Sequence, residues 1–446
     1  MVEIKKFFLS VTVLVLSFCL LVTSCSDIHR NNSHPEISNN SIRKGKSLAS
    51  DYCQRCHALP DPNLLDSKTW EQGVLPAMGP RLGIFSWNYM KYPSSRNDIN
   101  LEKGFYPQEP LLKPQEWKSI IDYYVATSPE NLVPNDSAQK TIKNDLVNFA
   151  IKTSSINYPE PASCLLKFFE TSFKSSFLVE DAVKQMLYRI DGNLTVIDSV
   201  NSKGPLLDVE AKGKNWLICD VGVMNPNNGK YGSVANITLN SSDKFIQVES
   251  ALFQGLARPV QTTSADFNND GKKDYLVCEF GFQTGALSWM ENKGNGKFDK
   301  HILRALPGAI KAYVEDYNHD GLQDIWALFA QGDEGPFLFI NNGNGTFSQK
   351  QVLRFPPVYG SSYFEFADIN KDGFADIVYT CGDNADYSTV LKPYHGVYIF
   401  INDGKNNFGQ KYFFHINGCY KAIAKDYDND GDVDIATISF FSDYKN

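Results

Sequence analysis

The 446-residue sequence contains few histidines and, beyond its first 22 residues, no apolar run long enough to span a membrane. The seven histidines are scattered, and only His57 lies within a recognisable motif. The sequence also lacks a nucleophile elbow, a phosphate-binding loop and a dinucleotide fingerprint. Basic residues are not in excess, because 43 Lys and Arg against 51 Asp and Glu give a net charge of −8. These absences argue against familiar hydrolase and nucleotide-dependent chemistry and against nucleic acid as a partner.

The composition is that of a folded protein with two or more domains, since 42% of the residues are hydrophobic and 13% are aromatic. Nine cysteines are present, and four of them belong to the two N-terminal motifs described below. The remaining five are an odd number, so at least one stays unpaired if all disulfides are internal. Cys219 and Cys278 lie in similar apolar segments, which favours buried thiols.

Residues 1–25 are predicted to be an export signal. Lys5 and Lys6 precede an apolar run from Phe7 to Val22, which is short for a membrane span. The run ends at Val22-Thr-Ser-Cys25, which resembles the lipobox of bacterial lipoproteins and implies lipidation of Cys25. An ordinary signal peptide with an incidental cysteine is the alternative. Residues 26–40 are polar and are predicted to be a tether, so lipid would anchor the protein to the bacterial cell envelope, with the outer membrane favoured.

The segment Cys53-Gln-Arg-Cys56-His57 predicts one covalently attached haem c. Two cysteines three positions apart can form thioethers to the haem vinyl groups, and the adjacent histidine can ligate the iron. A zinc site would need a second Cys/His pair nearby, and a thioredoxin-like redox pair would need a βαβ context. Neither is found here, so the motif predicts an electron-transfer function.

Residues 41–127 are predicted to form a small all-α domain around this motif. Apolar residues at helical spacing before Cys53 and after Pro114 predict two amphipathic helices, with Gly45 allowing an aromatic side chain of the other helix to approach. The pair resembles the crossed terminal helices of class I cytochromes c. Met78, in a loop bounded by Pro76 and Gly79, is preferred over Met90 as the sixth iron ligand, and Met90 is interpreted as a packing residue. A five-coordinate haem with Met78 in the core is the alternative.

After a linker predicted at 128–160, four nine-residue loops share one pattern and start 50, 52 and 58 residues apart. Oxygen side chains at positions 1, 3, 5 and 9, a carbonyl at position 7 and a glycine at position 6 can wrap a calcium ion, so up to four ions are predicted. The EF-hand glutamate at position 12 is absent, because that position holds Val277, Ala327, Tyr379 or Thr437. The predicted ligands are Asp266, Asn268, Asp270, Lys272 and Asp274; Asp316, Asn318, Asp320, Leu322 and Asp324; Asp368, Asn370, Asp372, Phe374 and Asp376; and Asp426, Asp428, Asp430, Asp432 and Asp434.

Each repeat also contains a hairpin turn, so one repeat reads as strand, metal loop, strand and hairpin, which is a four-stranded blade. The hairpin turns are at 292–298, 341–347 and 402–408. These repeats resemble the FG-GAP and VCBS families, which implies an all-β, integrin-like propeller over 161–446 with calcium in the blade loops. Two further blades are predicted, an eroded copy starting at Asp208 in which Lys212 replaces an acidic ligand, and one over 163–200.

This pattern gives five full blades and a partial sixth that stops after its second strand. A propeller normally closes its ring, so either an N-terminal strand completes the last blade or the chain is truncated, and truncation is favoured. The loops at 220–233, 281–285, 330–336 and 382–396 are predicted to form the variable face, with Tyr387, Tyr394 and His395 as candidate ligand-binding groups.

The predicted function is that of an exported, lipid-anchored electron carrier with a redox partner protein, whose calcium-stabilised propeller binds a partner protein or a glycan. One alternative is an enzymatic propeller that oxidises a sugar or alcohol and reduces the haem, or that cleaves polysaccharide as a lyase. The other is an adhesion module with a redox-sensing haem.

Overall fold

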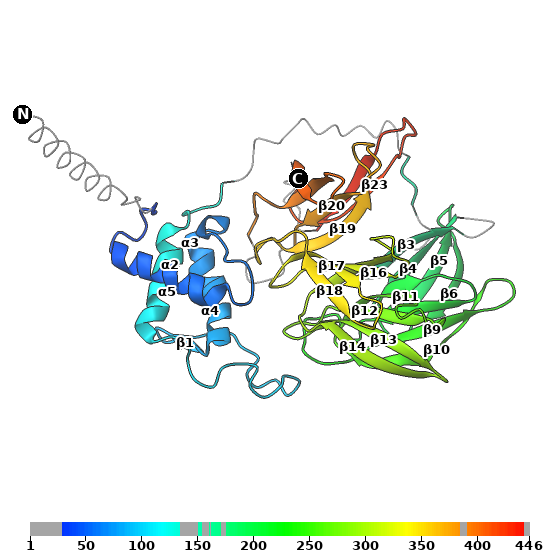
Figure 1. The fold of residues 1–446 in the computed structure, drawn as a ribbon, viewed down its shortest axis with the longest axis horizontal. Helices are drawn as coiled ribbons and strands as arrows, with labels where there is room; N and C mark the ends of the chain where they lie inside the picture. The colour runs from blue at the N-terminus through cyan, green and yellow to red at the C-terminus, as the bar shows by residue number, and fades with distance from the viewer. Residues whose placement is uncertain are drawn as a thin grey trace, which may run out of the picture.

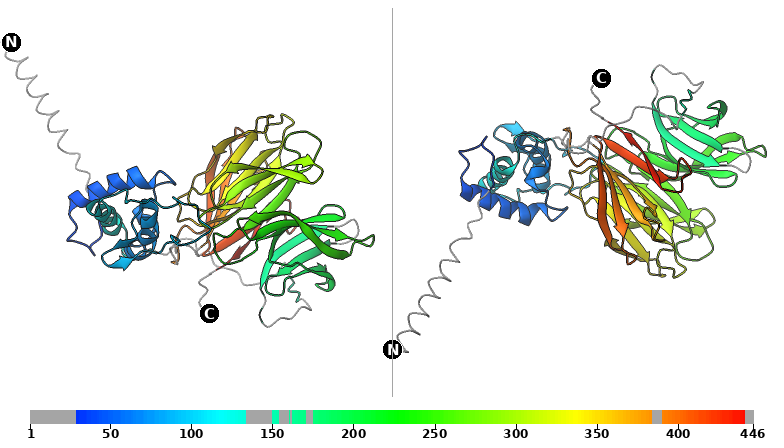
Figure 2. Two further views of the ribbon diagram at one scale, coloured as in Figure 1. Left: turned by 90° about the horizontal axis from the view of Figure 1, so that it is seen from below. Right: turned by 90° about the horizontal axis from the view of Figure 1, so that it is seen from above.

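The computed structural model describes residues 29–133, 150–153, 160, 162–170, 175–383 and 390–440. Helices cluster in the N-terminal part of the chain and strands make up the rest, and the helices are grouped beside the sheets (Figures 1 and 2). The predicted signal segment with Cys25, most of the predicted linker and Tyr387 lie outside the described residues.

Two helices cross at the centre of the helical domain, which we define as residues 29–133. These are α2 (Asn39–Cys53), capped by the Ser38 side chain, and α5 (Pro114–Thr127). A Cβ atom on Gly45 would lie 1.8 Å from the Ser119 carbonyl oxygen, so only glycine permits this crossing. Trp117, Ile120 and Tyr124 are buried, as their helical spacing predicted.

Short helical turns connect these two helices, and they correct the interpretation of both methionines. Met78 ends a helical turn instead of lying in a loop, because Pro76 occupies the first turn, where no N–H is needed. Gly79 serves close packing, since a Cβ there would lie 2.5 Å from the Tyr92 ring. Met90 is 50% exposed, so it is not a packing residue. The elements are η1 (Pro62–Leu64), α3 (Ser67–Thr69), the π-helical η2 (Trp70–Val74), α4 (Leu75–Met78), η3 (Gly79–Leu82), β1 (Ser86–Trp87) and β2 (Met90–Lys91).

Five four-stranded antiparallel sheets follow, and in each the strands pair in sequence order. They form the five predicted blades, including the two that lack a complete metal loop. The first two blades are β3 (Ser163–Glu170), β4 (Ser175–Asp181), β5 (Met186–Asp191) and β6 (Val196–Asn201); and β7 (Leu206–Glu210), β8 (Asn215–Asp220), β9 (Gly232–Leu239) and β10 (Phe245–Leu256).

The remaining blades carry the regular repeats, and a two-stranded sheet follows them. The third to fifth blades are β11 (Pro259–Ala265), β12 (Asp274–Glu279), β13 (Ala286–Gly294) and β14 (Lys297–Arg304); β15 (Ala309–Glu315), β16 (Asp324–Phe329), β17 (Gly335–Asn341) and β18 (Phe347–Gln351); and β19 (Ser361–Ala367), β20 (Asp376–Cys381), β21 (Gly396–Asn402) and β22 (Phe408–His415). The last sheet is β23 (Cys419–Lys425) and β24 (Asp434–Ser439), and β23 packs on β19 and β20.

The first strand of each sheet contacts the first strand of the next, from β3 through β7, β11, β15 and β19 to β23. These inner strands surround the axis of the propeller. Large aromatic side chains fill the space between the blades, and Trp289 and Trp326 are fully buried there. Cys219, Cys278, Cys381 and Cys419 are buried free thiols, which agrees with the interpretation of Cys219 and Cys278.

Candidate functional site

The Cys-x-x-Cys-His motif lies where helix α2 ends. Cys53 is the last residue of the helix and is half-buried, whereas Cys56 is exposed just beyond it. Both are free thiols in the structure. Burial, with a smaller contribution from Cys56, raises the pKa of the Cys53 thiol to about 11. Neither thiol forms a disulfide with another described residue, so both are available for covalent attachment.

His57 is held by a hydrogen bond between its Nδ1 atom and the Ala58 carbonyl oxygen, 2.8 Å away. A carbonyl can only accept, so this bond places the proton on Nδ1 and leaves the lone pair on Nε2. Metal-binding histidines generally show this arrangement. Burial lowers the pKa of His57, which also favours the neutral ring that a metal requires.

These residues fit a haem that is attached through Cys53 and Cys56 and ligated by His57 Nε2. Several apolar side chains of the helical core remain partly exposed and could be covered by a porphyrin, among them Tyr52, Leu59, Leu64 and Leu82. Met78 belongs to the same set, packed against the core without being fully buried. The helical turn that carries it can therefore offer a thioether.

The helical domain rests on the face of the propeller formed by the loops between second and third strands. Asn228 Nδ2 donates to Asp98 Oδ2 at 2.9 Å, and the Tyr106 hydroxyl donates to Gln283 Oε1 at 3.1 Å. A third loop places Asp333 where its charge influences the pKa of His57. Thus three of the loops predicted to be variable contact or face the helical domain.

The fourth of these loops also contacts the helical domain, and it corrects the interpretation of Tyr394 and His395. The Tyr394 hydroxyl donates to the Leu64 carbonyl oxygen at 3.1 Å, and its ring packs against the helical core. His395 is 1% exposed, and burial, with smaller effects from Lys392 and His415, lowers its pKa to about 3. Neither residue is an exposed ligand-binding group, because Tyr394 packs against the helical domain and His395 is buried.

All four predicted metal loops are closed by the same backbone hydrogen bonds. In each, the position 3 side chain accepts from the position 5 N–H, and the position 5 carboxylate accepts from the position 7 N–H. Position 4 has a left-handed φ between 55° and 63°, and the position 6 glycine has one between 79° and 92°. These bonds give the four loops the same tight turn.

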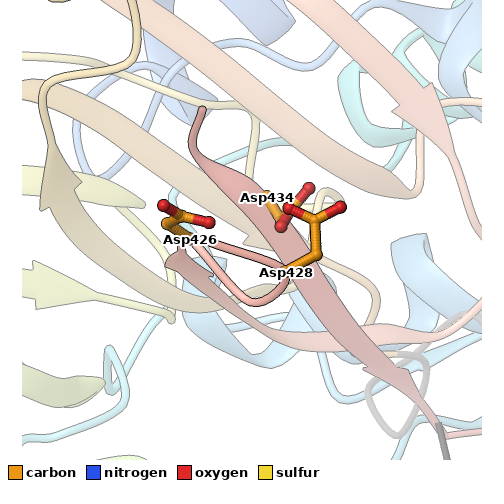
Figure 3. Close-up of side chains that lie close together, drawn as sticks. All are labelled: Asp426, Asp428 and Asp434. Atoms are coloured by element: carbon orange, nitrogen blue, oxygen red, sulfur yellow. The ribbon is translucent and has the colours of Figure 1, made fainter. Parts of the chain in front are cut away.

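In the loop at 426–434, oxygens of Asp426, Asp428 and Asp434 lie within 4.8 Å of one another (Figure 3). Calcium–oxygen distances are about 2.4 Å, so two oxygens on opposite sides of one ion lie about 4.8 Å apart. The three carboxylates therefore fit a calcium ion. In the other three loops the residue at position 3 is asparagine, whose amide oxygen can serve in the same way.

In the three metal loops that lie within four-stranded blades, the position 9 aspartate ties the loop to its blade. Asp324 is fully buried; its Oδ2 accepts from the Tyr317 N–H at 3.1 Å, and its Oδ1 accepts from the Asn341 N–H at 2.7 Å. Asn341 in turn donates to the Phe267 carbonyl of the preceding blade at 2.8 Å. Asp274 and Asp376 each accept the same two hydrogen bonds from backbone N–H groups of their own blades. Order in the metal loops is thereby coupled to blade packing.

Lysines neutralise some of the loop carboxylates. Lys272 Nζ lies 2.7 Å from Asp270 Oδ2, and Lys371 Nζ lies 2.5 Å from Asp432 Oδ1. Each lysine lowers the pKa of its partner aspartate. Both pairs are exposed, so a divalent cation could displace the ammonium groups at little cost.

Among the helices that the structure describes, none combines the length and the apolar character needed to cross a membrane.

Comparison with known proteins gives one family match and distant structural similarities. No curated protein matches the chain. Similar solved structures include the V. cholerae biofilm matrix protein Bap1, with a TM-score of 0.33 and 11% identity, covering 61% of this chain and 43% of that one. Saccharomyces cerevisiae Sqt1 has a TM-score of 0.37 and 12% identity, and the match covers 59% of this chain and 78% of Sqt1. A luciferin-regenerating enzyme has a TM-score of 0.32 and 8% identity, and the match covers 56% of this chain and 90% of that enzyme.

The chain thus spans less than half the length of Bap1. Residues 266–327 and 316–379 match the FG-GAP-like repeat family. The chain therefore carries FG-GAP-like repeats within a β-propeller of five four-stranded blades.

Proposed function

We propose that this protein is a c-type cytochrome that transfers electrons, with its haem-bearing helical domain mounted on a calcium-stabilised propeller. The observation that carries the proposal is the geometry of Cys53, Cys56 and His57 at the end of α2. Two free thiols flank the turn, and the Ala58 carbonyl orients the imidazole with its Nε2 lone pair unprotonated. When bound, the haem would supply a one-electron redox centre.

The protein residues would hold and tune this group. Each of the Cys53 and Cys56 thiols would add its S–H across one vinyl group, with no atom lost. His57 would ligate through Nε2 while Nδ1–H stays bonded to Ala58. Met78 would be the sixth ligand, which suits a relatively high-potential carrier.

The propeller would position the haem domain and present the remaining surface to partners. The four metal loops would hold calcium for structural purposes, because their carboxylates close the turns at the blade ends. Lipidation of Cys25 would place the protein at the bacterial cell envelope, facing the periplasm or the cell surface. A glycan or protein ligand would have to use a face other than the one covered by the helical domain, and the redox partner would approach the haem edge.

The β23–β24 pair would be an incomplete sixth blade. Its innermost strand continues the series of inner strands by packing on β19.

Absorption spectroscopy tests the haem assignment. The full chain, produced in a strain that matures c-type cytochromes, should show the sharp bands of reduced haem c after dithionite treatment. The Cys53→Ala/Cys56→Ala variant should lose them, whereas Cys164→Ala, which removes a thiol elsewhere in the chain, should keep them. Absence of the bands in the unmodified protein would refute the proposal, and an unchanged midpoint potential in Met78→Ala would refute the sixth ligand.

A further inference from the structure

Five of the inner strands carry a polar side chain at the same position around the propeller axis. In each of these strands, the pairing with the second strand of the sheet shifts register between the first and the third residue. The polar side chain belongs to that third residue. Because the shift recurs in each blade, these residues occupy equivalent places. They are Asp208 in β7, Gln261 in β11, Lys311 in β15, Tyr363 in β19 and Lys421 in β23.

Their charges meet in the centre of the propeller. The pKa of Lys311 is lowered first by burial and is then influenced by Asp208, Lys167 and Lys421, which belong to three other sheets. Lys167 lies in β3 and pairs with Asp208 at 2.9 Å. One small region of the axis therefore gathers lysines from the first, fourth and last sheets.

The carboxylates in this region are already occupied. Asp208 accepts from Lys167 Nζ through Oδ1 and from the Thr262 N–H through Oδ2. Glu365, on β19, accepts from the Ala424 N–H through Oε1 and from the Tyr363 hydroxyl through Oε2. Three ammonium groups thus face two carboxylates, and each carboxylate oxygen has a hydrogen-bond donor.

The ammonium groups of Lys311 and Lys421 lie beside aromatic rings. Lys311 Nζ lies 4.7 Å from the centre of the Tyr313 ring, and Lys421 Nζ lies 4.9 Å from the centre of the Tyr363 ring. Lys311 also lies 5.8 Å from the same Tyr363 ring. Within the described part of the chain, neither ammonium group has a hydrogen-bond acceptor or an ion-pair partner. Both side chains are half-buried, so solvent and small solutes still reach them.

We propose that the propeller axis contains a binding site for a small oxyanion, held between Lys311 and Lys421. An anion with two or more oxygens would accept hydrogen bonds from both ammonium groups and would offset the excess positive charge of the ring. The ring of Tyr363 lies near both lysines, and its hydroxyl donates to Glu365, which fixes the ring as a wall of the site. Carboxylate and tetrahedral oxyanions share this chemistry, and this site is independent of the proposed haem function.

Isothermal titration calorimetry on the full chain, as purified, tests the site. Sulfate is the tetrahedral probe, succinate is the carboxylate probe, and chloride at equal ionic strength is the reference. We expect saturable binding of one equivalent of sulfate or succinate, and the stronger of the two identifies the ligand class. No heat beyond the chloride reference with either probe would overturn the proposal.

Lysine variants locate the site. Lys311→Met and Lys421→Met should each weaken binding at least tenfold, and Lys421→Arg should retain it because the guanidinium keeps the charge and the donors. Lys405→Met removes an exposed lysine from a hairpin and should leave binding unchanged. Circular dichroism shows which variants fold. If Lys311→Met does not fold, Lys421→Met, in the partly exposed strand β23, still tests the site. Undiminished binding in a folded Lys421→Met variant would overturn the assignment.

Discussion

The hydroxyl of Tyr394 donates a hydrogen bond to the carbonyl oxygen of Leu64, 3.1 Å away, and so joins the propeller to the helical domain across 330 residues of sequence. The Tyr394 ring stacks on Tyr359, with ring centres 4.6 Å apart. Two other propeller residues, Asp333 and Arg354, influence the pKa of His57 through their charges. The propeller is therefore part of the environment of the proposed haem site.

Removing this contact should loosen the domain interface. Tyr394→Ala deletes the bond to Leu64 and the stacking on Tyr359, so amide hydrogen exchange in residues 61–66 should accelerate several-fold. Tyr412→Ala removes a tyrosine that is 46% exposed and serves as the control. Equal exchange rates in both variants would mean that the interface does not depend on Tyr394.

Gly45→Ala should destabilise the helical domain. The new Cβ would lie 1.8 Å from the Ser119 carbonyl oxygen, which requires α2 and α5 to move apart. Overpacking of this kind costs about 1–3 kcal/mol, measurable as a lower urea midpoint of the helical domain. Gly192→Ala is the matched control, because a Cβ there meets nothing within 4 Å. If the two variants unfold at the same urea concentration, the helices do not cross as described.

Features confined to short stretches of sequence were predictable, and features that join distant residues were not. Each metal loop spans nine residues, so residue type and spacing were sufficient to predict its sharp turn at the position 6 glycine. The haem at Cys53–His57 and the calcium ions stay predictions. The bond between Tyr394 and Leu64 has no local signature, and the covered loops were therefore interpreted as an exposed ligand face. The turn that holds Met78 was wrongly predicted to be a loop, because proline and glycine are common in loops. In the structure Pro76 lies in the first turn of a helix, and Gly79 allows close packing against Tyr92.

The lysines of the propeller axis are an intermediate case. Lys311, Tyr363 and Lys421 are separated by 52 and 58 residues, the same intervals as the metal loops. An alignment of the repeats would therefore have placed them in one column. What the sequence alone does not provide is which face of the inner strand points to the axis, because the register shift in each blade alters the alternation of side chains.

The stability of the propeller should fall in mild acid because of His395. The folded state keeps this ring neutral with a pKa of about 3, since burial opposes its charge, whereas the ordinary value is 6.5. Below pH 6.5 the unfolded chain binds the proton and the folded chain does not, so stability is lost as the pH falls towards 3. Between pH 6.5 and 5 this amounts to about 2 kcal/mol.

Urea denaturation at pH 7 and pH 5 measures this effect. His395→Gln should show a smaller loss between the two pH values than the unmodified chain. Gln349→Ala changes an exposed, non-titrating residue of β18 and should show the same loss as the unmodified chain. An identical pH dependence in all three proteins would contradict the role of His395.

Calcium should raise the thermal midpoint of the propeller, and chelation should lower it. A site held at 100 times its dissociation constant contributes about 2.7 kcal/mol. Asp426→Asn keeps an oxygen that can accept from the loop N–H groups but removes one negative charge at a position that is aspartate in all four loops, so the rise produced by calcium should shrink. Asp403→Asn, in a hairpin turn where the carboxylate accepts from the Lys405 N–H, should leave the rise unchanged. A midpoint that is the same in calcium and in chelator would contradict calcium binding by these loops.

Mass spectrometry of the protein from a strain that matures c-type cytochromes tests the central claim most directly. The haem-bearing reading predicts an intact mass higher by one haem, with the increment mapped by proteolysis to the peptide containing Cys53 and Cys56. A mature chain of unmodified mass, with both thiols free to react with iodoacetamide, would contradict it.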